Sequence, residues 1–342
     1  NILAHEMDDI HRDGEYFLVI GMPTVPRANE LDYLITTLTS LNDQIGNLHF
    51  DLNSGRTALL TDADRSQMNE LVAEVSKLKI LIIVMNVSGL THQRFMEAKE
   101  RFKDSKFIEF REHIDVPPKA QKPPKAKNRN IPDKKVMKQT RDIVALIRTA
   151  IGRGQYFLFM EDDFVLCPVA MLATIHYIKK ANARASDWIA IRTSYGMNGI
   201  LMQDRDLKVF ADYLEEHQAR RPPDHLVVEW YAGETDQSKK YKKARPNMAF
   251  RWNLYDHIGT KSSLRQQISP PYPICYEVLN KKVLFEVEAF DEKACPSDDL
   301  WPCTKSSRES SYIFNGFVLF DKELKNKQNQ EWEQRRKHKG KK

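Results

Sequence analysis

The chain has 342 residues, of which 41% are hydrophobic and 29% charged, a balance that excludes collagen-like and wholly disordered proteins. Its formal net charge is +6, and much of the positive excess lies in the segments Pro117–Lys135 and Lys322–Lys342. Charge alone governs encounter and solubility rather than recognition, and neither an RNA-binding aromatic signature nor a helix-turn-helix pattern accompanies it. We therefore predict no specific nucleic-acid partner.

The longest apolar run, near Ile80–Met85, is the size of a strand, whereas a membrane-spanning helix needs about 20 apolar residues. The chain begins at Asn1 without an initiator Met, so we expect it to be trimmed. Membrane contact is then expected only through an N-terminal anchor that is missing from this chain.

The four cysteines are too few for a disulfide scaffold and lack the spacing of a zinc site. Two of them, Cys295 and Cys303, lie close together in a loop that contains prolines. Their spacing is equally consistent with a local disulfide and with free thiols in a cytosolic protein.

Strand-like and helix-like segments alternate through most of the chain. Short apolar runs predict strands at Tyr16–Ile20, Ile80–Val84, Phe107–Phe110, Tyr156–Met160 and Trp188–Ile191. Apolar residues at helical spacing predict helices across Leu31–Leu41, Met68–Leu78, Val136–Ile147 and Met171–Ile178, with a further helix at Asp204–Glu216. This alternation is typical of an α/β fold with a mostly parallel central sheet and flanking helices. We expect the strands that begin at Tyr16, Ile80 and Tyr156 to be neighbours inside the sheet.

The segment Pro117–Lys135 is rich in proline and lysine and has too few apolar groups to offset the entropy of ordering it. It is predicted to be a mobile loop. A lid that becomes ordered when ligand binds and a plain surface insertion are equally consistent with this composition.

Three consecutive carboxylates, Glu161–Asp163, directly follow the apolar run Tyr156–Met160. Ligands of open α/β sheets bind outside the carboxyl ends of the strands, and adjacent carboxylates repel one another unless a cation or strong donors stabilise them. Mn²⁺ or Mg²⁺ suits oxygen ligands while it also binds phosphate oxygens. An acidic turn that caps the helix after Pro168 is an equally weighted alternative.

Three further features are weak individually. The turn Ser194–Gly199 contains two glycines, which permit close approach of the backbone to a ligand. Asp224 follows two prolines at an expected helix start, where a simple N-cap is the favoured alternative. His257 stands alone, and a lone histidine is more often structural than catalytic.

A series of short motifs occurs in order between Met22 and Leu264. They are Met22–Arg27, Tyr33–Leu38, Leu81–Val84, Glu161–Asp163, Asp187-Trp188, Tyr195–Ile200, Asp224-His225, Phe250-Arg251, His257–Gly259 and Ser262–Leu264. In this order and spacing the chain resembles the N-acetylglucosaminyltransferase IV family, which adds GlcNAc in β-1,4 linkage to the α-1,3-mannose arm of N-glycans.

The resemblance implies a GT-A type nucleotide-sugar-binding fold, UDP-GlcNAc as donor, and a Mn²⁺-dependent inverting transfer to a glycan or glycoprotein acceptor. It implies metal ligation by Asp163 and His257, and a catalytic base at Asp224, for which Asp256 and Glu229 are alternatives. Donor contacts are implied for Pro23, Thr24, Arg27, Glu161, Asp162, Gly196 and Gly199. It also implies a type II membrane protein of the Golgi lumen.

The implied organisation is a catalytic domain at 1–265, a C-terminal extension packed on it at 266–322, and a disordered basic tail at 323–342. Vertebrate-type members of the family carry a lectin-like domain, which we expect to be absent here, so the acceptor is less constrained than the donor. The alternatives are another UDP-sugar donor or acceptor glycan, and a catalytically silent glycan-binding regulator of a partner transferase. Retention of all three carboxylates, Glu161–Asp163, favours an enzyme.

Overall fold

The computed structural model describes residues 14–27, 31–46, 62–116, 131–259, 273, 275–279, 285–296 and 298–303. Most of the predicted loop Pro117–Lys135 lies outside these residues, and so do the motif Ser262–Leu264 and the basic tail. Within the described ranges, no helix has both the length and the apolar character needed to cross a membrane.

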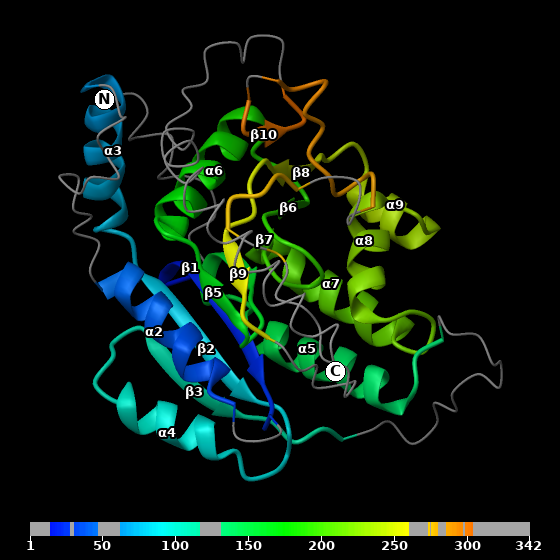
Figure 1. Cartoon of the computed structure of the whole chain (residues 1–342). Helices are drawn as coiled ribbons and strands as arrows, with labels where there is room; N and C mark the ends of the chain where they lie inside the picture. Colours follow the sequence, from blue (N-terminus) through cyan, green and yellow to red (C-terminus); the bar gives the residue numbers. More distant parts are fainter. Residues whose placement is uncertain are drawn as a thin grey trace, which may run out of the picture.

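The described residues form one large sheet and one strand pair (Figure 1). The large sheet contains β1 (Tyr16–Thr24), β2 (Ile80–Asn86), β3 (Ile108–Glu112), β4 (Gly154–Phe159), β6 (Ala190–Arg192), β7 (Ile200–Gln203), β8 (Asn247–Phe250) and β10 (Leu300–Trp301). Its order is β10-β8-β6-β7-β4-β1-β2-β3. The separate pair joins β5 (Phe164–Leu166) to β9 (Tyr255–His257) in antiparallel fashion. β1 pairs in parallel with both β2 and β4, which confirms the α/β class and the three predicted inner neighbours.

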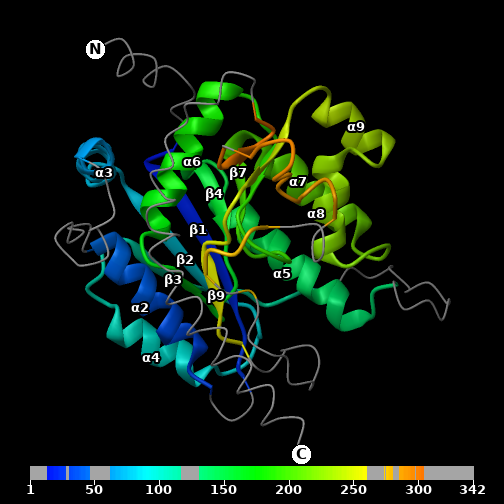
Figure 2. The same ribbon diagram turned by 45° about the horizontal axis from the view of Figure 1, so that its top comes forward.

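Helices cover both faces of the large sheet. One face carries α2 (Tyr33–Gly46), α3 (Asp62–Val75), α4 (Gln93–Arg101) and α6 (Ala170–Arg184). The other carries α5 (Lys134–Ala150), α7 (Asp204–His217), α8 (Pro223–Ala232) and α9 (Asp236–Lys242). Two views separated by a rotation show α2 and α4 on one side and α5, α7 and α8 on the other (Figures 1 and 2).

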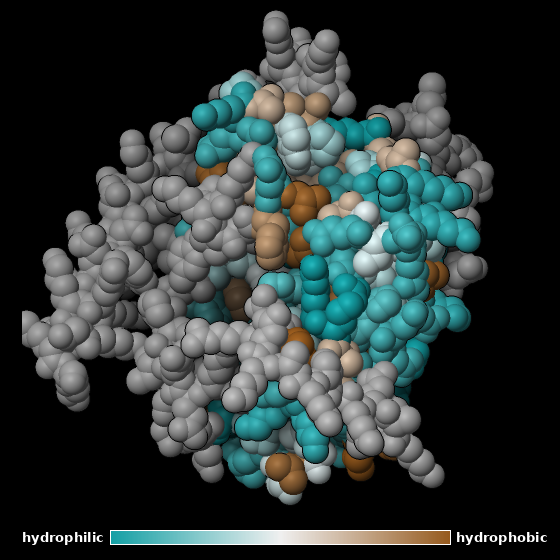
Figure 3. Space-filling model, turned by 90° about the vertical axis from the view of Figure 1, so that its right-hand side faces the viewer, coloured by the Kyte–Doolittle hydropathy of each residue, from teal (hydrophilic) through white to brown (hydrophobic). Residues whose placement is uncertain are grey.

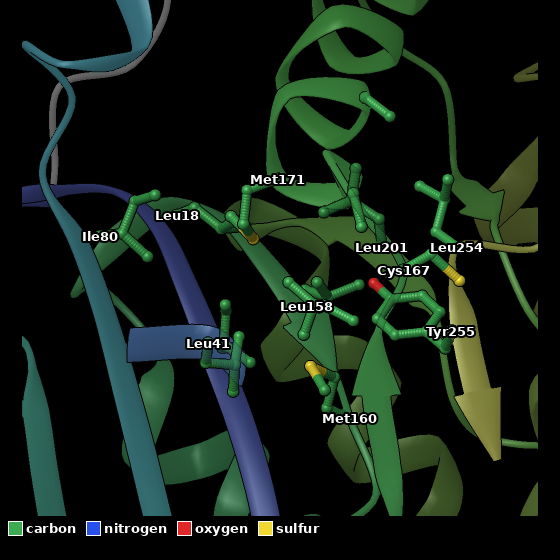
Figure 4. Close-up of a cluster of buried hydrophobic side chains, with 14 of the residues drawn as sticks. Leu18, Leu41, Ile80, Leu158, Met160, Cys167, Met171, Leu201, Leu254 and Tyr255 are labelled. Atoms are coloured by element: carbon green, nitrogen blue, oxygen red, sulfur yellow. The ribbon is translucent and has the colours of Figure 1, made fainter. Parts of the chain in front are cut away.

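The alternation of side chains along β1 and β2 explains why these strands are apolar throughout. In β1, Leu18 and Ile20 enter the core under α2 and α6, whereas Val19 enters the core under α5 and α7. In β2, Ile82 and Ile83 divide in the same way. A strand that is covered on both faces has no solvent-facing positions, so its sequence is a continuous apolar run. Figure 4 shows Leu18, Ile80 and Leu158 pointing into the first of these cores.

The C-terminal half of the sheet differs from the expected parallel arrangement. β7 lies antiparallel between β4 and β6, so four of the seven pairings in the described sheet are parallel. It begins directly after the turn Ser194–Gly199 and is followed at once by α7. The four-residue run Ile200–Gln203 is too short to stand out as a strand in the sequence, and only its pairing with β4 defines it.

All four cysteines are paired. Cys295 and Cys303 form the local disulfide that the sequence left open, which makes the free-thiol alternative wrong. A second disulfide, which the sequence did not indicate, joins Cys167 after β5 to Cys275. It closes a loop of 108 residues in sequence, and closure of a loop of that size stabilises a fold by about 5 kcal/mol in the chain-entropy account.

Candidate active site

The strand order of the sheet reverses between β1 and β4, and we call the region outside the carboxyl ends of these two strands the β1–β4 crevice. From β1 the chain proceeds to β2 and β3 on one side, and it returns to place β4 on the other side. In open α/β sheets, ligands bind where the strand order reverses in this way, outside the carboxyl ends of the strands. Thr24 ends β1, and Glu161–Asp163 follow the end of β4. The triplet therefore lies at the strand ends, as predicted.

Asp162 is held by groups that follow β1. Thr24 Oγ1 donates a hydrogen bond to Asp162 Oδ2 at 2.6 Å, and the Arg27 guanidinium pairs with Oδ1. From α2, Thr37 Oγ1 donates to the backbone carbonyl of Asp162 at 3.0 Å. Burial raises the pKa of the Asp162 carboxyl, while the charge of Arg27 acts in the opposite direction. Both carboxylate oxygens of Asp162 are thus already occupied by protein donors.

His92, which the sequence analysis did not single out, forms a hydrogen bond with the hydroxyl of Thr24. Its Nε2 lies 3.0 Å from Thr24 Oγ1, whose hydroxyl proton is committed to Asp162. Nε2 must therefore donate, while Nδ1 accepts the backbone N–H of Phe95 at 3.4 Å and caps α4. Only a neutral imidazole satisfies both contacts. Burial, aided by the charge of Arg27, lowers the pKa of His92 to about 4.

Because His92 is neutral in the folded protein, we expect the free energy of unfolding to decrease at acidic pH. The pKa of His92 is 6.5 in the unfolded chain and about 4 in the folded protein, so between these pH values only the unfolded chain binds the proton. Stability that is fully present above pH 6.5 is therefore lost as the pH falls towards 4, by up to about 3 kcal/mol. His92→Asn, which keeps an N-cap acceptor, is expected to remove this loss in denaturant unfolding curves measured across that range.

The matched control is His217→Asn, near the surface at the end of α7. Other groups also titrate in this pH range, so the informative quantity is the difference in slope between each variant and the parent protein. Equal slopes for His92→Asn and the parent would contradict a neutral buried His92.

Asp163 and His257 are brought together by the small β5–β9 sheet. Its register places Phe164 opposite His257, and the two rings stack with centroids 4.5 Å apart. His257 Nε2 lies 3.6 Å from Asp163 Oδ2, and Arg27 Nη2 lies 3.4 Å from the same oxygen. Burial alone would raise the pKa of Asp163, but the hydrogen bond from His257 and the charge of Arg27 lower it. Asp163 is therefore an ionised, buried carboxylate.

The second oxygen of Asp163 is the feature that fits a cation. Oδ1 is buried and has no hydrogen-bond partner among the residues that the structure describes, which is costly for a charged group unless something else binds it. A carboxylate oxygen suits Mn²⁺, a neutral imidazole nitrogen is a common metal ligand, and hard divalent cations commonly take their remaining ligands from water and substrate phosphate. Among the residues with described positions, no three His, Cys, Asp or Glu side chains form a metal cluster. The residues present thus fit a metal held by two protein ligands and a diphosphate.

Glu161 faces the turn Ser194–Gly199. Its backbone N–H donates to Asn198 Oδ1 at 3.0 Å, and a Cβ on Gly196 would lie 4.0 Å from Glu161 Oε1. Gly196 has φ of +62° and Gly199 has φ of +72°, so the turn requires glycine at both positions. Burial, with a contribution from the charge of Asp163, raises the pKa of Glu161 to about 8. Glu161 is therefore mainly protonated at neutral pH and can donate a hydrogen bond.

Because Gly259 has no side chain, the Asp163 and His257 side chains can pack directly against its backbone. A Cβ at this position would overlap Asp163 Oδ2 and would lie 2.6 Å from His257 Nε2. Gly259→Ala is therefore expected to displace both side chains and to lower Mn²⁺ affinity and sugar transfer by roughly 10- to 100-fold, the usual effect of misoriented ligands. The control is Gly46→Ala, where the nearest atom to a new Cβ is Phe107 Cζ at 3.8 Å. Unchanged Mn²⁺ affinity in calorimetry would contradict the assignment.

Asp224 lies in the first turn of α8, at the helix start that the sequence predicted. The N-cap position is occupied by Pro222, so the interpretation of Asp224 as a simple N-cap is wrong. Its carboxylate accepts the backbone N–H of His225 at 3.0 Å. Within the described ranges, the structure does not bring Asp224 into contact with Asp163 or His257, whereas Arg27 lies 3.4 Å from Asp163.

The structure corrects two hypotheses about acidic side chains. The acidic triplet does not cap the helix after Pro168, because α6 begins at Ala170 with Val169 at its N-cap and no capping side chain. Glu229 is buried and bound by Arg220 and Tyr213. Burial alone would raise its pKa, but the hydrogen bond from Arg220 lowers it. A buried carboxylate held in this way cannot reach an acceptor, so Glu229 is a structural residue.

Comparison with known proteins gives no family assignment. No family model and no curated protein matches the chain. Among solved structures, residues 1–349 of S. aureus TarS match with a TM-score of 0.35 and 12% identity, over 64% of this chain and 55% of that chain. So distant a likeness establishes neither a shared fold nor a shared function. The resemblance to the N-acetylglucosaminyltransferase IV family therefore stays a prediction.

Proposed function

We propose that this protein is an inverting glycosyltransferase that transfers GlcNAc from UDP-GlcNAc to a mannose of an N-glycan and uses Mn²⁺ or Mg²⁺. The observation that carries the proposal is Asp163, ionised and buried at the crevice between β1 and β4, with Oδ1 unpaired and with Arg27 and His257 beside it. A nucleoside diphosphate with a divalent cation is the ligand class that such a set of charges suits.

The donor would lie in the β1–β4 crevice. Asp163 and His257 would hold the cation, which, when bound, neutralises the charge that develops on the departing diphosphate. Arg27 adds a fixed positive charge beside it, and its Nε is buried without a partner. Glu161, which faces the turn Ser194–Gly199, offers its carboxyl group to a donor hydroxyl. The glycines of the turn Ser194–Gly199 have no side chains, so the donor sugar can approach the backbone there closely.

The acceptor would enter from the side of α8. Inversion in a single displacement requires a base that takes the acceptor hydroxyl proton on the side opposite to the leaving diphosphate. Asp224 is our assignment for that base. The donor sugar and the acceptor sugar must both fit between the base and the metal-binding residues. A base in direct contact with Asp163 would leave no room for them, so the lack of contact between Asp224 and Asp163 suits this role.

Pairing of all four cysteines supports a compartment that permits disulfides, because cytosolic thiols are kept reduced. We accordingly propose the Golgi lumen as the location, with membrane attachment through a preceding anchor.

The decisive test is a donor screen. Purified protein would be incubated with UDP-GlcNAc, UDP-GalNAc or UDP-galactose and a free mannose-terminated N-glycan, with Mn²⁺, with Mg²⁺ or with EDTA. We expect UDP release and a new β-linked GlcNAc, visible by NMR, only with UDP-GlcNAc and a divalent cation. UDP-GlcNAc with Mn²⁺ should also raise the unfolding temperature as the ligand concentration rises. Transfer of galactose or GalNAc would correct the donor, and absence of both transfer and thermal shift would refute the proposal.

A further inference from the structure

A half-exposed aromatic side chain stands beside the helix start that carries Asp224. Phe285 has 53% of its surface exposed, and its ring meets the ring of His225 edge to face with centroids 5.6 Å apart. The side of the molecule that carries α8 and α9 is otherwise largely hydrophilic, with small hydrophobic patches (Figure 3). Asp224 precedes His225 in the chain, so this contact places the Phe285 ring near the start of α8.

The segment that carries Phe285 is anchored by a buried ion pair. The backbone N–H of Glu288 donates to the carbonyl of Phe285 at 2.9 Å, which forms a turn. The side chain of Glu288 is almost fully buried and pairs with Arg192 of β6 and with the hydroxyl of Tyr231 of α8. A buried ion pair of this kind is costly to separate, so the turn is held against both β6 and α8.

The same arginine reaches the donor crevice. Arg192 Nη1 donates to the carbonyl of Gly196 at 2.5 Å, and Gly196 lies against Glu161. Contacts therefore connect the turn Ser194–Gly199, through Arg192 and Glu288, to the backbone of Phe285. The segment that carries the exposed ring is thus tied to the same part of the fold as the proposed donor site.

We propose that Phe285 is the stacking surface of the acceptor site, where its ring packs on the C–H face of a hexose of the acceptor glycan beside Asp224. This inference rests on the proposed function. A hexose presents an apolar C–H face and a rim of hydroxyls, and it therefore matches an aromatic ring that lies near the helix start of Asp224. A hexose fits better than an apolar peptide side chain, because only the hexose has hydroxyls that can donate to the Asp224 carboxylate.

The test compares binding of a free mannose-terminated N-glycan to Phe285→Ala, Phe285→Trp and the parent protein by ligand-observed NMR, and its acceptor KM in transfer. We expect Phe285→Ala to weaken glycan binding and raise the acceptor KM roughly tenfold, as for loss of one aromatic contact. Phe285→Trp should restore both. UDP-GlcNAc hydrolysis without acceptor and the unfolding temperature should stay unchanged, because the ring is half exposed.

Met96→Ala is the matched control, since Met96 on α4 is 49% exposed and lies on the opposite face of the sheet. It should leave glycan binding intact. Equal glycan binding by Phe285→Ala and the parent protein would overturn the inference, and so would failure of the free glycan to bind the parent protein. Failure of the proposed function gives a different pattern, in which transfer is absent but the free glycan still binds and still depends on Phe285.

Discussion

Asp163→Asn is expected to abolish sugar transfer while the protein stays folded. The substitution keeps the size of the side chain but removes the charge that the unpaired Oδ1 presents to a cation. Loss of a metal ligand that also orients the diphosphate should cost at least about 100-fold in turnover, since misoriented ligands alone cost up to that much. The substitution also removes the pairing of Asp163 with Arg27 and His257, but Arg27 keeps its ion pair with Asp162, so the unfolding temperature should change little.

The measurement is turnover at saturating UDP-GlcNAc across a Mn²⁺ titration, beside Mn²⁺ affinity by calorimetry. Glu109→Gln is the control, because Glu109 pairs with Arg153, which lies at the amino end of β4, away from the crevice. That variant should keep its turnover. Near-normal transfer by Asp163→Asn in Mn²⁺ would remove Asp163 from the metal site and with it the main support for the proposed function.

The sequence predicts the inner strands well because their burial leaves a local trace. β1 and β2 are covered on both faces, so nearly every position before their last residues, Thr24 and Asn86, is apolar and the run is visible without any knowledge of the fold. β9 is different. It is three residues long, it contains Asp256 and His257, and its strand conformation depends on pairing with β5. Such a strand leaves no periodic signal in the sequence.

The same distinction applies to the site. The sequence marks Glu161–Asp163 because three carboxylates after an apolar strand are chemically unusual, but only the β5–β9 pairing places His257 beside them. Nothing in the sequence around His92 marks it as part of the site, since that role depends on its hydrogen bond with Thr24 at the end of β1. Arg192 offered a partial signal, because a charge at the end of a buried strand requires a partner. Its partner Glu288 is distant in sequence and cannot be found without the fold.

Asp224→Asn is expected to lower turnover by two to four powers of ten, the usual size of a general-base contribution. An asparagine keeps the shape of the side chain but cannot accept the acceptor proton. UDP-GlcNAc and Mn²⁺ affinities should barely change, because Asp224 does not contact Asp163 or His257 within the described ranges. The helix should remain stable, since Asp224 is not its N-cap and loss of a charge in the first turn costs about 0.5 kcal/mol.

Comparison with the amide variants of Glu229 and Asp256 identifies the base, because each variant has a different expected result. Glu229→Gln would break a buried pair with Arg220, so it should lower the unfolding temperature rather than act on turnover alone. Asp256 lies next to His257 in β9. If Asp256→Asn lowers activity, it should therefore do so by weakening the binding of Mn²⁺ and of the donor. The base is the residue whose loss lowers turnover at saturating donor without loosening the donor or the fold. Full turnover by Asp224→Asn would reject this mechanism, because the acceptor proton would then have to leave by another route, although transfer itself could still be metal-dependent.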